Sequence, residues 1–258
     1  MDATEAARFV FGSPNRLAVL RALRSTPGRP RDVAERVDVS RATVQRCLRD
    51  CADRGWVERV DGDYRPTATG ARVIRSCETF LADLDAIDGA AALLADLPCF
   101  DPPLPLKSLA DAELVVSTPE QPHRAARAFA ERIDESDADH YDCLSPMMTR
   151  LHIDAFGARL EDGASVELVC PRAVVAAERE VRPETVARSL ALPEFELYVH
   201  PERFEYALTV TDAEVFVATV GQARAMQAVA WTDDDTLREW ARKRYAAEKR
   251  AAERPEIE

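Results

Sequence analysis

The segment 38–50 constrains the fold of this chain more than any other, because it has the pattern of a helix with its own start signal. Ser40 stands before the helical stretch, where its hydroxyl can accept a free backbone N–H group as the N-cap. At about 100° per residue, Val44, Leu48 and Cys51 fall on one side of this helix. That side is predicted to be buried.

The opposite side of the same helix carries Gln45, Arg46 and Arg49, and it has no carboxylate before Asp50. These side chains suit a helix in the major groove of DNA. Gln can pair with adenine, Arg can pair with guanine, and either can hold a phosphate. An ordinary amphipathic helix with a solvated basic face would have the same pattern. The segments on either side decide between the two interpretations.

Two shorter helices are predicted before this segment. Ser13 as N-cap and Pro14 at the first helical position start a helix over about 14–25. Pro30 starts a second helix over about 30–36. Two short helices, a tight turn and a longer helix with a basic face are typical of a helix-turn-helix.

A β-hairpin is predicted directly after the third helix. Gly55 is expected to end that helix as a C-cap residue, and 56–60 then alternates like a strand. The turn signal Asp61-Gly62-Asp63 leads to a second short strand over 64–66. This order of elements predicts a winged helix, in which the hairpin forms the wing.

The same residues resemble a known family. Ser40-Arg41-Ala42-Thr43-Val44 and Asp53-Arg54-Gly55-Trp56-Val57 resemble the recognition helix and wing start of archaeal winged-helix regulators of the ArsR/MarR-like group. Thr67-Ala68-Thr69-Gly70 is similar to the step that leads those proteins from the wing to the next helix. The resemblance covers roughly residues 8–75 and implies that the third helix reads bases while the wing touches the backbone or minor groove.

Carried over residue by residue, this resemblance implies the positions of the DNA contacts. They are Ser40, Arg41, Thr43, Gln45, Arg46 and Arg49 in the helix, and Arg59 and Arg65 in the wing. The wing tip departs from the family pattern because Asp61 and Asp63 are acidic. Carboxylates at the tip disfavour a deep contact of the wing with phosphates.

The distribution of charge favours a local site for a polyanion. Residues 13–66 contain 12 arginines and 8 carboxylate side chains, a net charge of +4 on a chain whose formal net charge is −12. Lysine is scarce, with only Lys107, Lys243 and Lys249. An acidic, lysine-poor composition resembles that of proteins from salt-loving archaea. A GC-rich genome is the alternative explanation.

One long helix is predicted over 69–97, with a break expected at Gly89. Its apolar residues recur at helical spacing: Val73, Ile74, Cys77, Phe80, Leu81, Leu84, Ile87, Leu93 and Leu94. Such a seam favours a homodimer that presents two recognition helices to a two-fold operator. Packing of this helix against the same chain is the alternative. Four prolines between 98 and 105 then indicate a stiff linker.

Three parts follow from this pattern, and the fold class is α+β. They are a winged helix-turn-helix DNA-binding domain at 1–68, a linker and dimerisation helix at 69–97, and a mixed α/β effector domain at 98–258. Strands are predicted at 113–117, 140–144, 165–170, 194–200, 206–211, 213–220 and 222–230. Helices are predicted at 122–133 and 147–160, with two short helices in 172–190 and a final helix capped by Thr232. Strands separated first by helices and then by turns predict a mixed sheet whose last three strands are antiparallel.

The second half of the chain also resembles a known family. The prolines after the long helix, a strand that ends at Pro171, and a final helix that begins Trp231-Thr232-Asp233-Asp234 carry this resemblance. Residues from about 100 to 250 resemble the effector domain of archaeal regulators of the methanogenesis-regulator (FilR-like) type.

The sequence contains no pattern typical of catalysis, and no enzyme activity or cofactor is expected. It has no H-E-x-x-H, G-x-S-x-G, P-loop or dinucleotide glycine motif. His140 and Cys143, with Asp139 and Asp142, could hold a metal, but a solvated strand edge is the favoured interpretation. The six cysteines form no C-x-x-C pair and are predicted to be small buried residues, with a redox pair of Cys47 and Cys51 as the alternative.

A pocket for a small-molecule effector is expected in the second half. Aromatic, methionine and histidine side chains on its predicted strands and helices could enclose a ligand: Met147, Met148, His152, Phe156, Phe195, Tyr198 and Tyr206. The alternative is that each of these is a core residue.

The sequence therefore predicts a sequence-specific, DNA-binding transcriptional regulator that forms a homodimer and binds double-stranded DNA. No apolar run approaches the length of a membrane span, and the N-terminus lacks a signal peptide pattern, so the cytoplasm is the expected location. The alternative function is a protein-interaction module that uses a winged helix without binding DNA.

Overall fold

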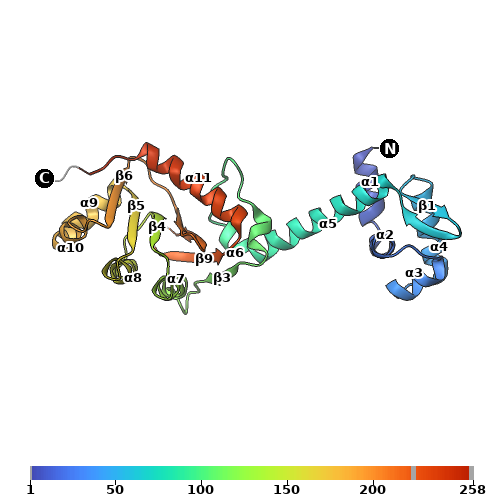
Figure 1. Cartoon of the computed structure of the whole chain (residues 1–258), viewed down its shortest axis with the longest axis horizontal. Helices are drawn as coiled ribbons and strands as arrows, with labels where there is room; N and C mark the ends of the chain where they lie inside the picture. The colour runs from blue at the N-terminus through green and yellow to red at the C-terminus, as the bar shows by residue number, and fades with distance from the viewer. Residues whose placement is uncertain (1, 222–224, 256–258) are drawn as a thin grey trace. The chain divides into compact units, whose positions relative to one another are not determined.

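The computed structural model of the chain describes residues 2–221 and 225–255, and Figure 1 draws it with its helices and strands labelled. The chain divides into two compact units, Met1–Asp83 and Leu84–Glu258. The division falls inside the helix α5, which runs from Ala68 to Gly89.

The N-terminal unit has the helices and the hairpin that the sequence predicts. Its elements are α1 (Ala3–Phe11), α2 (Pro14–Ser25), α3 (Pro30–Val37), α4 (Arg41–Ala52), β1 (Val57–Val60), β2 (Asp63–Pro66) and the first part of α5. The predicted winged helix-turn-helix is confirmed, and α1 is a helix that the sequence analysis did not predict. Ser13 is the N-cap residue of α2, but its side chain makes no capping hydrogen bond.

The helix α4 is fixed at its start by a cap and along one side by the core. The Thr43 amide donates to Oγ of Ser40 at 3.2 Å, which satisfies one of the free N–H groups of the first turn. Val44, Leu48 and Cys51 are fully buried in a cluster with residues of α2, α3 and α5. The apolar stripe thus sets which side of α4 faces outward.

The wing is a two-residue β-hairpin. Asp61 and Gly62 form its turn with φ values of +51° and +94°, as a tight turn between twisted antiparallel strands requires. Asp63, predicted as a turn residue, already belongs to β2. Gly55 was predicted as the C-cap of α4, but α4 ends at Ala52 and Gly55 lies in the following turn at φ +68°.

The prediction of a long helix with a break at Gly89 is confirmed. The helix α5 ends at Gly89, and the short helix α6 (Ala91–Leu94) follows. Ile74 and Cys77 of α5 are buried in the core of the N-terminal unit.

The C-terminal unit is a mixed α/β domain. After α6 it contains η1 (Leu106–Leu109), β3 (Glu113–Val116), α7 (Arg124–Asp134), β4 (His140–Leu144), α8 (Arg150–Glu161), β5 (Ser165–Pro171), α9 (Arg172–Val181), α10 (Pro183–Leu190), β6 (Phe195–His200), β7 (Tyr206–Val210), β8 (Val215–Val220), β9 (Met226–Thr232) and α11 (Asp235–Ala251). Residues 222–224 of the strand predicted at 222–230 lie outside the described residues.

Within the described residues, these strands form one seven-stranded sheet in the order β3-β9-β8-β7-β4-β5-β6. The strands β4, β5 and β6 are parallel, and the other neighbours are antiparallel. The predicted mixed sheet with three antiparallel strands at its end is therefore confirmed. The helix α11 covers one face and α7 to α10 cover the other (Figure 1).

Two predicted helix starts in this unit are wrong. The final helix is capped by Asp234, whose Oδ1 accepts the Leu237 amide at 2.9 Å, and not by Thr232. Thr232 still pairs with Val215 in the sheet, so its backbone is extended. The helix α8 starts at Arg150 instead of Met147, because Thr149 caps it through the amide of His152.

None of the described helices is long and apolar enough to cross a membrane.

Candidate nucleic-acid interface and ligand cavity

The outward side of α4 is a surface of unpaired polar and cationic side chains. Within residues 2–221 and 225–255 the structure has no hydrogen bond or ion pair to the side chains of Arg41, Gln45, Arg46 and Arg49, and all four are exposed. The first carboxylate on the helix is Asp50, at its C-terminal end. Donors held on a fixed helix without internal partners are free to bond an external acceptor.

Ser40 and Thr43 stand at the N-terminal end of this surface, but both take part in the cap. Their hydroxyl oxygens lie 2.9 Å apart, in addition to the amide hydrogen bond that fixes the helix start. Ser40 is exposed and Thr43 is half-buried. Each hydroxyl therefore already makes a hydrogen bond within the helix cap, and a contact with DNA would be made in addition to that bond.

The two arginines of the wing differ in their surroundings. Arg65 Nε donates to Oε1 of Glu58 at 2.8 Å, directly across the hairpin. Arg59 is exposed and lies over the ring of Tyr64, with 5.7 Å between the guanidinium carbon and the ring centroid. Arg65 lies on the same face of the hairpin as its cross-strand partner Glu58. Arg59 follows Glu58 on the same strand and therefore points to the opposite face of the wing.

The acidic wing tip is partly offset by a neighbouring cation. Asp63 pairs with Arg29 at 3.5 Å between Oδ1 and Nε, and both side chains are more than half exposed. An exposed pair of this kind contributes little stability, but it lowers the negative charge that the tip presents.

Cys47 and Cys51 lie behind the exposed side of α4, in the core. Burial raises the pKa of both thiols, that of Cys51 to about 12. A buried thiol with a raised pKa is a poor nucleophile, which favours the interpretation of these residues as core residues. Among the six cysteines, Cys99 is exposed and the others are buried.

A cavity of about 520 Å³ lies in the C-terminal unit, between the sheet and the helices α8 and α10. Met147, His152 and Phe156, which the sequence analysis assigned to a ligand site, all line it. Met148 and Phe195 line it as well. Five further lining residues were not predicted from the sequence: Phe129, Cys143, Gly157, Thr209 and Phe216.

Tyr198 and Tyr206, assigned to the same site, lie on the opposite face of the sheet. Tyr206 is packed under α11, where its hydroxyl donates to Oε1 of Glu248 at 3.1 Å. The hydroxyl of Tyr198 donates to Oε2 of Glu196 at 2.6 Å. Side chains alternate between the two faces along a strand. Ala207 and Phe195 face the cavity, so Tyr206, one residue from Ala207, and Tyr198, three residues from Phe195, face α11.

His152 is the most buried polar ring at the cavity, with 9% of its surface exposed. Burial lowers its pKa to about 4, because an imidazolium loses hydration there. Its Nδ1 shares a hydrogen bond with the Thr149 hydroxyl. The ring is therefore neutral near pH 7.

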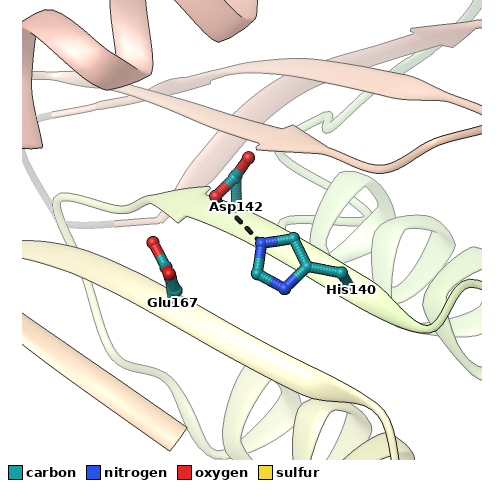
Figure 2. Close-up of side chains that lie close together, drawn as sticks. All are labelled: His140, Asp142 and Glu167. Atoms are coloured by element: carbon teal, nitrogen blue, oxygen red, sulfur yellow. Dashed lines mark hydrogen bonds and ion pairs between the residues drawn. The ribbon is translucent and has the colours of Figure 1, made fainter.

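A cluster of three side chains that could hold a metal ion lies on the face of the sheet that α11 covers. Figure 2 shows His140, Asp142 and Glu167 close together on β4 and β5, with His140 Nε2 3.2 Å from Oδ1 of Asp142. Cys143, which the sequence suggested as a metal ligand together with His140, faces the opposite side of the sheet. The third possible ligand beside His140 and Asp142 is instead Glu167. Glu167 Oε2 already accepts the Tyr245 hydroxyl at 3.0 Å and the Lys249 ammonium. The Lys249 ammonium of the chain itself thus supplies the positive charge that a metal ion would bring to Glu167.

The fold is that of a winged helix-turn-helix with an exposed cationic side on α4, followed by a mixed α/β domain. A protein-family model for the middle domain of the methanogenesis regulatory protein FilR1 matches residues 122–250, half of the chain. The chain belongs to this family. A second model, for the HVO_A0261 N-terminal domain, matches residues 4–89. Both resemblances seen in the sequence are thus confirmed.

Solved structures show more distant likenesses. TrmBL2, an archaeal chromatin protein, has 14% identity over 98% of this chain and 100% of its own, with a TM-score of 0.42. PcaV, a transcriptional regulator from Streptomyces coelicolor, has 31% identity over 31% of this chain and 62% of its own, with a TM-score of 0.28. Nuc, a phospholipase D family member from Salmonella typhimurium, has 16% identity over 57% of this chain and 100% of its own, with a TM-score of 0.43. These scores are too low to support an argument about function. No curated protein sequence matches the chain.

Proposed function

We propose that the chain is a sequence-specific transcriptional regulator that places α4 in the major groove of double-stranded DNA. The observation that carries the proposal is the set of exposed Gln45, Arg46 and Arg49 side chains, which have no partners among the described residues. Their helix is held by a buried stripe and a hydroxyl cap, so these side chains are presented from a rigid support.

Readout of bases is favoured over attraction to phosphate alone. The chain has a formal net charge of −12, which opposes non-specific attraction to a polyanion. Binding must then depend on short-range contacts, and Gln and Arg make the two-point hydrogen bonds that distinguish adenine and guanine. We assign a phosphate contact to Arg41, which is exposed at the start of α4.

The wing has a secondary part in this proposal. Arg59 is free of carboxylates among the described residues, whereas Arg65 is paired with Glu58. We assign the stronger wing contact to Arg59 for this reason.

The test uses the full chain and a library of random double-stranded DNA, from which bound sequences are enriched and sequenced. The change is Arg46→Ala with Arg49→Ala, and the matched control is Arg72→Ala with Arg75→Ala, two exposed arginines of α5 in the same unit. Each lost base contact costs about 1–3 kcal/mol, so the double variant should bind the enriched sequence about 100-fold more weakly or worse. Equal affinity of the double variant and wild type would overturn the proposal. An equal loss in the control would indicate attraction by total charge only.

We further propose that the regulator is a homodimer formed through α5. Phe80, Leu84 and Ile87 are 50%, 44% and 41% exposed, although all three are large and apolar. Their i, i+4, i+7 spacing places them on one side of the helix. A second copy of the same helix would cover these side chains, as in a two-stranded seam.

Light scattering after size-exclusion chromatography measures the molar mass and therefore the oligomeric state of the chain. Phe80→Glu with Leu84→Glu should give a monomer where the wild-type chain gives a dimer, because two buried charges would oppose the seam. Leu151→Glu changes another exposed leucine, on α8, and should leave the dimer intact. A dimer that survives the double change would place the interface elsewhere.

The C-terminal unit would act as the sensor of a small-molecule effector. Its cavity of about 520 Å³ falls in the size range of ligand sites. An effector can shift DNA binding only if it binds the DNA-competent and incompetent states with different affinity. The readout is the DNA affinity of the full chain with and without a bound effector.

A protein-interaction module without DNA binding is the alternative, and the acidic wing tip of Asp61 and Asp63 favours it. The same experiment separates the two functions. A chain that enriches no DNA sequence while its helices and hairpin remain folded would support the alternative.

A further inference from the structure

The cavity of the C-terminal unit has an apolar interior. Its walls include Phe129, Phe156, Phe195 and Phe216, together with Met147 and Met226. The charged residues at the cavity are exposed, which places them at its mouth: Asp154, Glu161 and Arg188. A ligand with a formal charge would lose its hydration inside without gaining an opposite charge. The interior therefore selects for an uncharged molecule.

One polar ring reaches into this apolar space. His152 is 9% exposed, and Nδ1 is already bonded to the Thr149 hydroxyl. The same hydroxyl oxygen accepts the backbone amide of His152 at 3.4 Å, which leaves its hydrogen free to donate to Nδ1. When the hydroxyl donates to Nδ1 in this way, the ring hydrogen is on Nε2, and the ring nitrogen left for a ligand is a hydrogen-bond donor.

The helix that carries His152 also leaves room for a ligand. Gly157 lines the cavity from the middle of α8, and a Cβ atom built on it would meet no heavy atom within 4 Å. Glycine is an unfavourable residue inside a helix. Its presence here keeps open a volume that any larger side chain would occupy.

We propose that the cavity binds an uncharged, largely apolar molecule, aromatic or branched, with a carbonyl oxygen that accepts a hydrogen bond from Nε2 of His152. This inference rests on the proposed role of the C-terminal unit as an effector sensor and names the chemical class of the effector. The ring of Phe129, whose centroid lies 5.1 Å from that of His152, holds the donor in place. The phenylalanine side chains supply apolar contact, and the histidine supplies orientation.

The test compares two probes of the same shape, benzophenone and diphenylmethane, which differ by a carbonyl group in place of a methylene. Each is titrated into the full chain without DNA, and binding is followed by calorimetry or by ligand NMR. The measured quantity is the ratio of the two affinities, so the general hydrophobic difference between the probes cancels between variants. We expect both probes to bind the wild-type chain.

The substitution His152→Leu removes the donor and should lower the preference for benzophenone about tenfold, with little change in diphenylmethane affinity. His152→Gln keeps an N–H donor near the position of Nε2 and should restore part of the preference. His123→Leu, at an exposed histidine, is the matched control and should leave the ratio unchanged. Gly157→Phe should abolish binding of both probes by filling the space.

Three outcomes would overturn the inference: no binding of either probe to the wild-type chain, unchanged binding to Gly157→Phe, or an unchanged affinity ratio in His152→Leu. The titration contains no DNA, so its failure leaves the proposed role of α4 intact. Conversely, the Arg46→Ala, Arg49→Ala variant should bind both probes like wild type. Loss of DNA binding is therefore distinguishable from loss of the ligand site.

Discussion

Gly70 lies against the carbonyl oxygen of Trp56 so closely that a Cβ atom at position 70 would be 1.8 Å from that oxygen. The same oxygen accepts the Thr67 amide at 3.0 Å, and the Thr67 hydroxyl donates to the Gly55 carbonyl at 2.7 Å. The Gly70 amide in turn donates to the Thr67 hydroxyl oxygen at 3.0 Å. These contacts fasten the start of α5 to the turn between α4 and the wing.

Gly70→Ala should therefore destabilise the N-terminal unit by about 3 kcal/mol, because the contact is with backbone that cannot move aside cheaply. Urea unfolding of the full chain, with hydrogen exchange of the segment 41–66 as the local readout, measures this. Gly89→Ala is the control, since a Cβ there meets nothing within 4 Å. Equal stability of the two variants would show that α5 can shift away from Trp56.

Ser40→Ala should lower stability by about 1 kcal/mol, because the substitution removes the hydroxyl that accepts the Thr43 amide. Ser13 is also an N-cap residue, but its side chain makes no capping bond. Ser13→Ala should therefore change the unfolding free energy by less than about 0.5 kcal/mol. Chemical denaturation of the pair tests the geometry of the cap, and a larger cost at Ser13 would contradict it.

Glu58→Gln should strengthen DNA binding about twofold at low salt, because it releases Arg65 from its pairing partner. Glu35→Gln is matched to it, since Glu35 pairs with Arg31 on α3 at 3.1 Å and lies outside the wing. Fluorescence anisotropy with an enriched DNA sequence gives both affinities. If the two variants bind equally well, Arg65 makes no specific contact.

The stability of the chain should depend on pH through His152. Its folded pKa of about 4 lies below the value of about 6.5 expected in the unfolded chain. The unfolded chain therefore takes up a proton first, and the unfolding free energy falls as the pH drops from about 6.5 to about 4, by about 3 kcal/mol in total.

His152→Gln removes this titration, so the stability difference between wild type and variant should shrink by the same amount across that window. Urea unfolding at several pH values measures it, with His123→Gln as the control at an exposed histidine. Parallel pH profiles for wild type and His152→Gln would show that His152 is hydrated in the folded chain.

Much of the secondary structure was predictable because its signals are local. The buried stripe of Val44, Leu48 and Cys51 and the cap at Ser40 follow from helical spacing and one hydroxyl. The turn at Asp61 and Gly62 follows from residues that tolerate positive φ. These features depend on neighbours within a few residues, which the sequence displays directly.

The ligand site was predictable only in part. Met147, His152 and Phe156 share one side of the sheet, but Tyr198 and Tyr206 lie on the other. Alternation shows which residues of one strand share a face, but the face that receives α8 or α11 depends on how helices far apart in the chain pack. Thr232 lost its predicted role as cap for a similar reason, since pairing with Val215 keeps it in the sheet.

The sequence by itself determined the winged helix, the outward side of α4, the long helix and the succession of strands and helices along the second domain, because periodicity and capping are properties of adjacent residues. The tertiary structure alone decided that Gly70 meets Trp56, that Tyr206 lies under α11, and that an open space remains beside Gly157. Those relationships depend on side chains brought together by packing, whose distances no local pattern specifies.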